Sequence, residues 1–167
     1  MMQTKALSLS IDNLFTNRCH IRLFQEKDLE RFIQYHNNLA WMQYQGFKGL
    51  TSEQYRQELL QPHPLSEGIQ LAVADRQTDI LLGNLYLRQE KDCCWIGYTI
   101  SPDYARQGYG FEAVEGLIQR LFAQGFLTVK AGALPQNTVS IALLQKLGFH
   151  YLSMEQDEAI FCRYNVR

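Results

Sequence analysis

The spacing of apolar residues along the chain changes between the two-residue period of strands and the longer period of helices. Residues Leu14–Phe24 alternate between apolar and polar after Asn17, which predicts a first strand. The apolar face of this strand carries Cys19, Ile21 and Leu23, and the polar face carries His20 and Arg22.

Four segments have helical spacing, and six more have the pattern of strands bounded by turn residues. The predicted helices are Asp28–Asn37, Thr51–Leu60, Gly108–Gln124 and Thr138–Leu147. The further predicted strands are Gln70–Asp75, Ile80–Arg88, Cys93–Ile100, Phe126–Ala133, Phe149–Met154 and Ala159–Val166. Residues Leu39–Tyr44 either extend the first helix or form a second short one.

The order of these elements predicts a single α/β domain over residues 1–167. The first half contains a three-stranded antiparallel meander, whereas strands and helices alternate in the second half. A mixed sheet covered by helices on both faces accommodates both arrangements. No repeat or linker interrupts the pattern.

Composition and charge exclude several classes of partner. The chain is 46% hydrophobic and 20% charged, with a formal net charge of -1 and no long basic run. We therefore expect neither direct nucleic-acid binding nor a polybasic membrane surface. No apolar stretch approaches the roughly 20 residues of a membrane span, and Met1–Ser10 lacks a signal-peptide core, so we expect a cytoplasmic protein.

The four cysteines do not form a metal-binding pattern. Cys19, Cys93, Cys94 and Cys162 include no CxxC pair and have no histidine nearby at the spacing of a zinc site. Each lies in a segment with strand character. We therefore expect no metal, and interpret the cysteines as buried free thiols in a reducing compartment.

The clearest chemical signal lies between a predicted strand and the longest predicted helix. The strand ends near Ile100, and the helix opens at Gly108 and Gly110. The first N–H groups of a helix have no partner within it, and glycine lets a ligand approach the backbone, so a pyrophosphate suits this turn. Tight packing of the helix on the strand is the alternative. The spacing matches neither the Walker A loop nor the dinucleotide-binding fingerprint.

Three segments resemble one family. IGYTISPDYARQGYGFEA, which begins at Ile96, resembles the acetyl-CoA-binding motif of the GNAT superfamily of N-acetyltransferases, whose core is Gln/Arg-x-x-Gly-x-Gly-Ala. LPQNTVSIALLQKLGF, from Leu134, and TNRCHIRLFQEKDLERF, from Thr16, resemble two further segments of its RimJ/RimL branch, which acetylates the N-termini of ribosomal proteins. The resemblance spans nearly the whole chain.

The resemblance implies a GNAT-like central sheet, mostly antiparallel and splayed at the strand Trp95–Ile100, with acetyl-CoA in the gap. The pantetheine arm would bond backbone groups near Ile100, and Asn137 and Ser140 would approach the cofactor from the other side. The pyrophosphate would meet the amides of Gln107, Gly108, Tyr109, Gly110 and Phe111.

Two positions depart from the family pattern. The first position of the glycine motif is Ala105, so we expect Arg106 to replace the missing side-chain contact. Many family members use a tyrosine in the last helix as the acid that protonates the departing thiolate, and that position is Leu144 here. The RimJ/RimL resemblance implies that a serine, Ser140, takes this role. The alternative is a serine that satisfies backbone groups in the first turn of its helix.

No single residue stands out as the general base. Amide formation needs a neutral amine, a donor for the developing oxyanion and a proton for the thiolate. Tyr98 could orient an amine or a water, or could belong to the core. Glu90 and Asp92 could act through a chain of waters, or could form an exposed turn. Glu112 could complement the helix dipole instead of taking part in the chemistry.

Aromatic residues mark the expected acceptor site. Trp41, Tyr44 and Phe47 lie in the segment that walls this site in the family, and we expect them to line the substrate entrance. We expect an acetyl-CoA-dependent N-acetyltransferase in which a primary amine, either a protein N-terminal α-amine or a small molecule, attacks the thioester directly. The alternative is a non-catalytic acyl-CoA-binding module or regulator. The sequence leaves open whether two copies pair as a homodimer.

Overall fold

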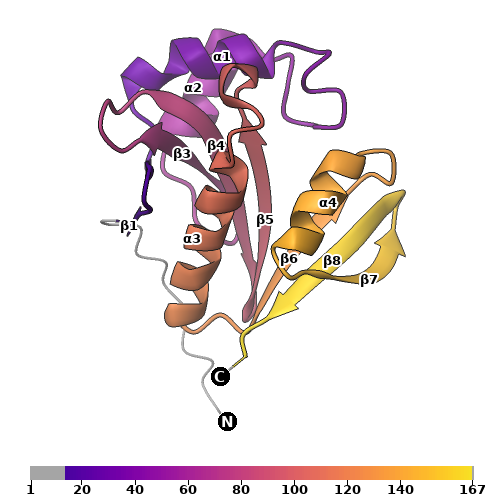
Figure 1. Cartoon of the computed structure of the whole chain (residues 1–167). Helices are drawn as coiled ribbons and strands as arrows, with labels where there is room; N and C mark the ends of the chain where they lie inside the picture. The colour runs from indigo at the N-terminus through magenta and orange to yellow at the C-terminus, as the bar shows by residue number, and fades with distance from the viewer. Residues whose placement is uncertain (1–13, 167) are drawn as a thin grey trace.

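The computed structural model describes residues 14–166, so the segment Met1–Ser10 lies outside the described residues. Eight strands form one sheet in the order β1-β2-β3-β4-β5-β6-β8-β7 (Figure 1). Every neighbouring pair is antiparallel except β5 and β6, which run parallel. The mixed, mostly antiparallel sheet expected from the sequence is confirmed.

The element boundaries differ from the predicted ones by only a few residues in most cases. The strands are β1 (Leu14–Phe15), β2 (Cys19–Arg22), β3 (Ile69–Asp75), β4 (Leu81–Glu90), β5 (Cys93–Ile100), β6 (Thr128–Ala133), β7 (His150–Glu155) and β8 (Glu158–Tyr164). The helices are α1 (Leu29–His36), α2 (Ser52–Leu60), α3 (Tyr109–Ala123) and α4 (Thr138–Lys146), with short 3-10 turns η1 (Glu26–Asp28) and η2 (Pro102–Tyr104).

Helices cover both faces of the sheet. Successive residues of a strand point to opposite sides, and here both sides carry apolar residues that need covering. On one face α3 and α4 join a larger core that also contains Leu85, Leu87 and Ile96 of the sheet (Figure 1). On the other face α1 and α2 pack against Ala72 in a smaller core. The buried stripe of α3 is Ala113, Val114, Leu117, Ile118 and Leu121, which explains why this helix lies across the centre of the sheet.

Strands β5 and β6 pair over only part of their length. Their partners run from Cys93 opposite Thr128 to Trp95 opposite Lys130, and beyond Trp95 the two strands separate. Over the same stretch β5 stays paired with β4 as far as Ile100. Figure 1 shows the gap opening toward the N-terminal ends of α3 and α4. The predicted splay of the sheet is therefore confirmed.

The first predicted strand, Leu14–Phe24, was wrong as a single element. It is two short strands, β1 and β2, which pair antiparallel with Leu14 opposite Ile21. The turn between them is closed by a hydrogen bond from Thr16 N to Cys19 O (2.9 Å). Alternation alone does not distinguish one strand from a hairpin when the turn carries no glycine.

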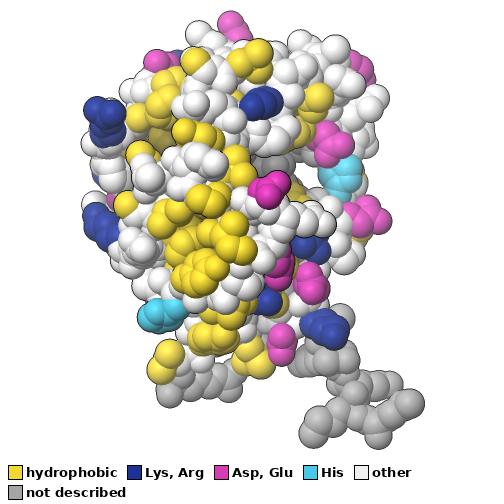
Figure 2. All heavy atoms as spheres, turned by 90° about the vertical axis from the view of Figure 1, so that its right-hand side faces the viewer, with side chains coloured by type: hydrophobic (Ala, Val, Ile, Leu, Met, Phe, Trp, Pro, Cys, Tyr) yellow, Lys and Arg dark blue, Asp and Glu magenta, His cyan; other side chains and the backbone are white. Residues whose placement is uncertain are grey.

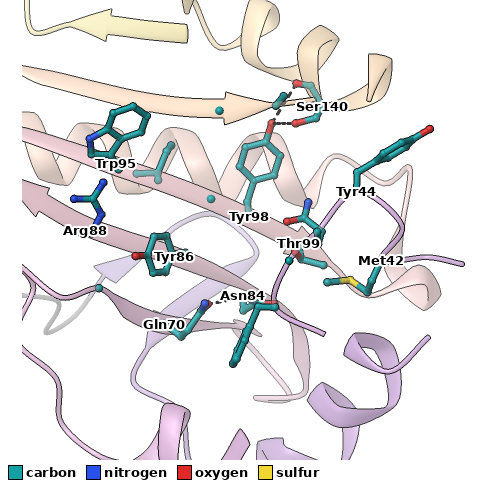
Figure 3. Close-up of a pocket in the computed structure, with 18 of the residues that line it drawn as sticks. Met42, Tyr44, Gln70, Asn84, Tyr86, Arg88, Trp95, Tyr98, Thr99 and Ser140 are labelled. Carbon is teal, nitrogen blue, oxygen red and sulfur yellow. Dashed lines mark hydrogen bonds between the residues drawn. The ribbon is translucent and has the colours of Figure 1, made fainter. Parts of the chain in front are cut away.

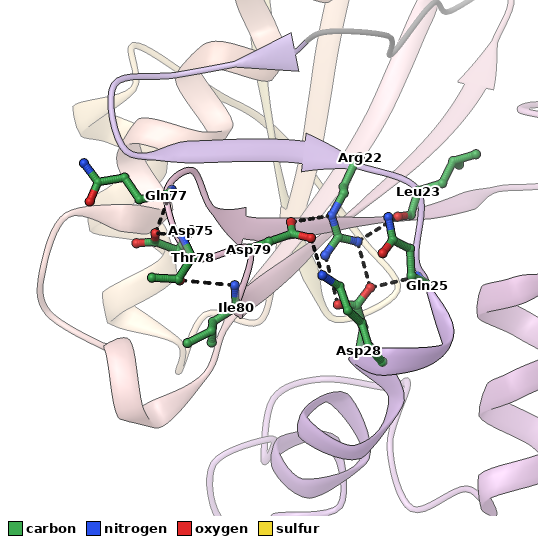
Figure 4. Close-up of polar contacts among 10 residues, drawn as sticks. Arg22, Leu23, Gln25, Asp28, Asp75, Gln77, Thr78, Asp79 and Ile80 are labelled. Carbon is green, nitrogen blue, oxygen red and sulfur yellow. Dashed lines mark hydrogen bonds and ion pairs between the residues drawn. The ribbon is translucent and has the colours of Figure 1, made fainter.

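The end of β2 carries a buried arginine that two carboxylates neutralise (Figure 4). Arg22 Nη1 and Nη2 donate to the two oxygens of Asp28 at 2.8 and 3.0 Å, and Arg22 Nε donates to Asp79 at 2.9 Å. Asp79 also pairs with Lys27. Arg22 lies on the face opposite Cys19 and Ile21, as predicted, but helices cover that face too, so Arg22 is only 7% exposed. The prediction was wrong for Leu23, which lies beyond β2 and is 61% exposed.

Residues 39–44 form hydrogen-bonded turns, so the predicted helix at Leu39–Tyr44 was wrong. Met42 N donates to Asn38 O (2.9 Å), and the Asn38 side chain accepts from Trp41 N (3.1 Å). These bonds close a single turn after α1. The turn brings the aromatic side chains of this segment toward the end of β5.

The four cysteines are buried free thiols, as the sequence predicts. Burial raises the pKa of Cys19 and Cys93 to about 11 and that of Cys94 to about 12. Thiols with such pKa values are protonated and unreactive at neutral pH. Within residues 14–166, no three His, Cys, Asp or Glu side chains lie close enough to hold a metal ion, and no helix is long and apolar enough to cross a bilayer.

Candidate active site

Two cavities meet where β5 and β6 separate. The gap cavity, of about 480 Å³, lies at the N-terminal ends of α3 and α4. The sheet-face cavity, of about 660 Å³, lies over the β4 and β5 residues that face α1 (Figure 3). Both cavities are lined by Met42, Tyr44, Gln45, Tyr98, Thr99, Asn137 and Ser140. Molecules that occupied the two cavities would therefore meet at these residues.

The gap cavity brings together most of the residues that the sequence assigns to cofactor binding. Those that line it are Ile100, Arg106, Gly108, Tyr109, Gly110, Phe111, Asn137 and Ser140. Gln107 does not line the cavity, and its carbonyl oxygen accepts from Arg18 Nη1 (3.0 Å). The three predicted entrance residues divide between the cavities: Trp41 lines only the gap cavity, Phe47 only the sheet-face cavity, and Tyr44 both.

The turn before α3 presents free amides to the gap cavity. Gly108 has a φ of 83°, in the left-handed region that favours glycine, and it directs the chain into the helix. The first helical hydrogen bond joins Glu112 N to Gly108 O (3.1 Å). The amides of Tyr109, Gly110 and Phe111 therefore have no partner within α3, which makes them available to an anion.

Strand β5 presents backbone groups to the same cavity. Ser101 N donates to Leu82 O on the β4 side (2.8 Å), and alternate residues of an antiparallel strand direct their N–H and C=O groups to opposite sides. Ile100 and Tyr98 therefore direct theirs into the gap. Ile100 O accepts from Trp41 Nε1 (2.9 Å). This edge can bond the amides of an extended ligand such as pantetheine.

Charges in the two cavities have opposite signs. Among residues 14–166, Arg106 and Lys146 are the only Asp, Glu, Lys or Arg residues that line the gap cavity. The sheet-face cavity is lined instead by Glu58, Glu67 and Glu158, and Arg88 is the one Lys or Arg that the described part of the chain adds to them. The gap cavity therefore suits an anionic ligand, and the sheet-face cavity suits a cationic one. Lys146 was not predicted as a cofactor residue, and it follows Val139 and Leu143, which also line the gap cavity, at helical spacing.

Arg18, which the sequence does not identify as functional, holds the glycine turn in place. Its Nε pairs with Glu112 Oε1 (2.8 Å), its Nη1 bonds Gln107 O, and its guanidinium lies 4.1 Å from the ring centre of Tyr109. Glu112 also accepts from Thr16 Oγ1 (2.6 Å) and from Arg18 N (2.9 Å). The hydrogen bonds and ion pair of Glu112 therefore connect the β1–β2 turn to α3.

The two predicted catalytic residues contact each other across the gap. Tyr98 OH lies 2.8 Å from Ser140 Oγ and 3.2 Å from Ser140 O, and Figure 3 shows the Tyr98 ring directed from β5 toward α4. Burial raises the pKa of Tyr98 to about 12, so it is protonated at neutral pH and serves as a donor. Asn137 Oδ1 caps α4 by accepting from Ser140 N (3.2 Å), which leaves the Ser140 hydroxyl free for other partners.

The remaining candidates lie away from this junction. Glu90 accepts from Trp95 Nε1 (3.1 Å) and pairs with Arg88 (3.5 Å). Glu90 and Asp92 flank the start of β5, and Tyr98 lies five residues beyond Cys93, roughly 16 Å at the rise of a strand. They therefore form an exposed turn at the far end of the strand. Leu144 is fully buried in the core.

Known proteins share both the sequence pattern and the fold. A family model described as an acetyltransferase (GNAT) domain matches residues 18–150, which is most of the chain. The chain belongs to the GNAT acetyltransferase family. As a GNAT enzyme it is an N-acetyltransferase that uses acetyl-CoA as the acetyl donor. The free amides of the glycine turn and the cationic lining of the gap cavity fit this donor, whose pyrophosphate is its most strongly charged part.

Relatives and solved structures agree with this membership. The uncharacterised N-acetyltransferase p20 of Bacillus licheniformis is 25% identical over 155 residues, which are 88% of this GNAT chain and 87% of p20. A GNAT-family acetyltransferase from Bacillus anthracis has a TM-score of 0.81 at 21% identity, covering 90% of this chain and 97% of that chain. RimL, a ribosomal-protein α-N-acetyltransferase in complex with coenzyme A, has a TM-score of 0.75 at 16% identity, covering 95% and 97%. These two structures share the GNAT fold.

Proposed function

We propose that this enzyme acetylates a primary amine, either a protein N-terminal α-amine or the amine of a small molecule, by direct attack on the thioester. Acetyl-CoA would lie in the gap cavity and the amine would arrive from the sheet-face cavity. The observation that carries this proposal is the contact of Tyr98 with Ser140 at the junction of the two cavities. Attack there forms the C–N bond and breaks the C–S bond.

Residues of the gap cavity would hold the donor by its charge and by its amides. The N–H groups of Gly108, Tyr109, Gly110 and Phe111 would bind the pyrophosphate, and Arg106 and Lys146 would neutralise phosphate charge. The backbone groups that Tyr98 and Ile100 direct into the gap would bond the pantetheine arm, with Trp41 Nε1 also on Ile100 O, and Asn137 would close the site from α4. Gln107 would support the glycine turn through its backbone carbonyl, which accepts from Arg18, and its side chain would take no part in donor binding.

Ser140 would protonate the departing sulfur. Its O–H is free to point into the junction when Tyr98 OH donates to Ser140 Oγ, because a hydroxyl accepts and donates at the same time. The proton passes from Ser140 Oγ to the thiolate, and the donated bond from Tyr98 stabilises the oxygen that remains. Tyr98 keeps its own proton, because its pKa is about 12.

The proton balance favours an acceptor amine of low pKa. A lysine-type amine near pKa 10.4 must lose its proton at a cost of about 4 to 5 kcal/mol at pH 7, whereas an α-amine costs about 1 kcal/mol. No side chain that the structure describes at the junction has the character of a general base, so the attacking amine would release its proton to water, and Ser140 Oγ would then regain a proton from water. This supports an α-amine as the acceptor.

The test combines a thiol-release assay over a panel of primary amines with calorimetry of acetyl-CoA binding. We expect acetyl-CoA to bind and at least one α-amine to be acetylated, with the product identified by mass. Binding without turnover on any amine would favour the alternative of a non-catalytic acyl-CoA-binding module. Absence of acetyl-CoA binding would contradict both.

A further inference from the structure

A segment that follows α1 lies across the junction of the two cavities. All residues of 40–47, which we call the strap segment, line the gap cavity, the sheet-face cavity or both. Met42 and Tyr44 line both, and Figure 3 shows them beside Thr99 near the end of β5. Figure 2, which faces the side of α4 and β7, shows a hollow between these elements and the end of the molecule that carries α1. The strap segment therefore borders the place where the proposed C–N bond would form.

The C-terminal end of the strap segment is attached to α1 and the residue after it. Phe47 O lies 2.6 Å from Nδ1 of the buried His36 and accepts from it, since a carbonyl has no proton to donate. Just beyond, Gly49 N donates to Asn37 Oδ1 (3.0 Å), and Asn37 Nδ2 donates to Leu50 O (3.2 Å). This end of the segment is therefore held without any help from the cavities.

The rest of the strap segment has one hydrogen bond to the sheet. Within the described chain, the other hydrogen bonds of residues 40–46 join them to one another or to flanking residues. The exception is Trp41, whose Nε1 donates to Ile100 O (2.9 Å). Packing of Met42, which is 1% exposed, supports the same stretch. The Trp41–Ile100 bond is therefore the polar link between the strap segment and β5.

This bond lies on a backbone group that the donor would also use. Ile100 O points into the gap, where an N–H of the pantetheine arm would donate to it. A carbonyl oxygen has two lone pairs, so it can accept from the indole and from the arm together. Trp41 lines only the gap cavity and is 42% exposed, so a ligand in the gap would cover part of its ring. The indole and the apolar parts of the arm would then shield each other from water.

We propose that the strap segment closes over the pantetheine arm when acetyl-CoA binds, and that the Trp41–Ile100 hydrogen bond holds it closed. Bound donor stabilises the closed segment, because the indole gains contacts with the arm and keeps its bond to Ile100 O. Closure fixes Tyr44 and Phe47 as a wall of the acceptor cavity and limits the access of water to the thioester. The inference rests on the proposed function, because it assumes that acetyl-CoA occupies the gap cavity.

Fluorescence of Trp41 reports the closure directly. The chain contains two tryptophans, so Trp95→Phe leaves Trp41 as the only one. We expect acetyl-CoA to shift the emission of this variant to shorter wavelength, with a midpoint equal to the Kd that calorimetry gives for the same protein. An unchanged Trp41 emission at saturating acetyl-CoA would overturn the inference.

Tryptic cleavage after Lys48 tests whether the strap segment itself closes. Lys48 Nζ donates to Met42 O (2.9 Å), so its accessibility depends on this segment. We expect acetyl-CoA to slow this cleavage about fivefold or more relative to cleavage after Arg76, in the exposed turn between β3 and β4. Trp41→Phe keeps a ring and loses the N–H, so it should abolish this protection. Leu39→Ala is the matched control, because Leu39 is an exposed neighbour that lines neither cavity.

Trp41→Phe should also raise the Kd for acetyl-CoA about fivefold, the effect of losing one hydrogen bond. Acetyl-CoA that binds without slowing cleavage after Lys48, or protection that survives in Trp41→Phe, would overturn the inference and leave the proposed function standing. Both readouts need binding alone. Protection by acetyl-CoA in a protein that acetylates no amine would therefore support the strap segment's role and contradict the proposed function.

Discussion

The hydroxyl groups of Tyr98 and Ser140 lie 2.8 Å apart, although 42 residues separate them in the sequence. Tyr98 belongs to β5 and Ser140 to α4, so their bond crosses the gap where β5 and β6 no longer pair. It is the point at which the two sides of the proposed active site touch.

Removing the serine hydroxyl should stop proton delivery and preserve donor binding. We expect Ser140→Ala to lower kcat about 100-fold or more, because a general acid contributes on that order, and to leave the Kd for acetyl-CoA nearly unchanged. Tyr98→Phe should have a smaller effect, because Ser140 keeps its own proton. Steady-state kinetics with calorimetry measures both, and Ser66→Ala in an exposed loop is the control. Full turnover in Ser140→Ala would show that the acid is another group.

The glycine turn should not tolerate a side chain that is charged like the ligand. Gly108→Asp strains a residue with φ of 83° and places a carboxylate beside the free amides, so acetyl-CoA binding should be lost. Gly46→Asp is a matched control, because nothing lies within 4 Å of a Cβ at Gly46. Calorimetry gives the affinity, and circular dichroism checks the fold. Tight binding by a folded Gly108→Asp protein would place the pyrophosphate elsewhere.

Arg18 should affect donor binding through the turn that it holds. We expect Arg18→Met to raise the KM for acetyl-CoA about tenfold, the effect of losing one charge-assisted hydrogen bond at a binding turn, with little change in kcat. Arg31→Met, at an exposed position on α1, controls for the loss of a positive charge. If Arg18→Met changed kcat and not KM, the turn would not be the binding element.

Glu112 should link stability to acid pH. Burial alone raises the pKa of Glu112, but hydrogen bonds from Thr16 and Arg18 outweigh it and hold the pKa below its usual 4.5. A carboxylate whose pKa is lower in the folded state stabilises the fold above its unfolded pKa, and this stabilisation is lost as the pH falls through the folded pKa. Between pH 6 and pH 3, the free energy of unfolding should therefore fall more steeply for the wild type than for Glu112→Gln. Denaturant unfolding at several pH values measures this, and parallel curves would contradict it.

Much of the site could be predicted because its signals are local. The glycine turn and the strand before it depend on neighbouring residues, whereas Asn137 and Ser140 came from the family resemblance, and the structure brings all of them together around the gap cavity. The hydrophobic period also predicts nearly every helix and strand. Local sequence sets capping, turn geometry and burial periodicity, which is why these predictions agree with the structure.

The parts that could not be predicted depend on contacts between distant residues. Arg18 meets Glu112 across 94 positions, and nothing beside Arg18 in the sequence marks it as the support of the turn. Arg22 is buried only because Asp79, 57 positions away, joins Asp28 around it.

The separation of β5 from β6 also separates the proposed acceptor site from the proposed donor site. The surface proposed to receive the acceptor is built mainly from β4, β5 and the segment after α1, whereas the proposed phosphate site is built from the turn before α3 and from α4. Substitutions on β3 and β4 can therefore change which amine is accepted while the acetyl donor is held as before. A sheet in which two neighbouring strands separate allows the acceptor specificity of an enzyme to change while its donor site stays the same.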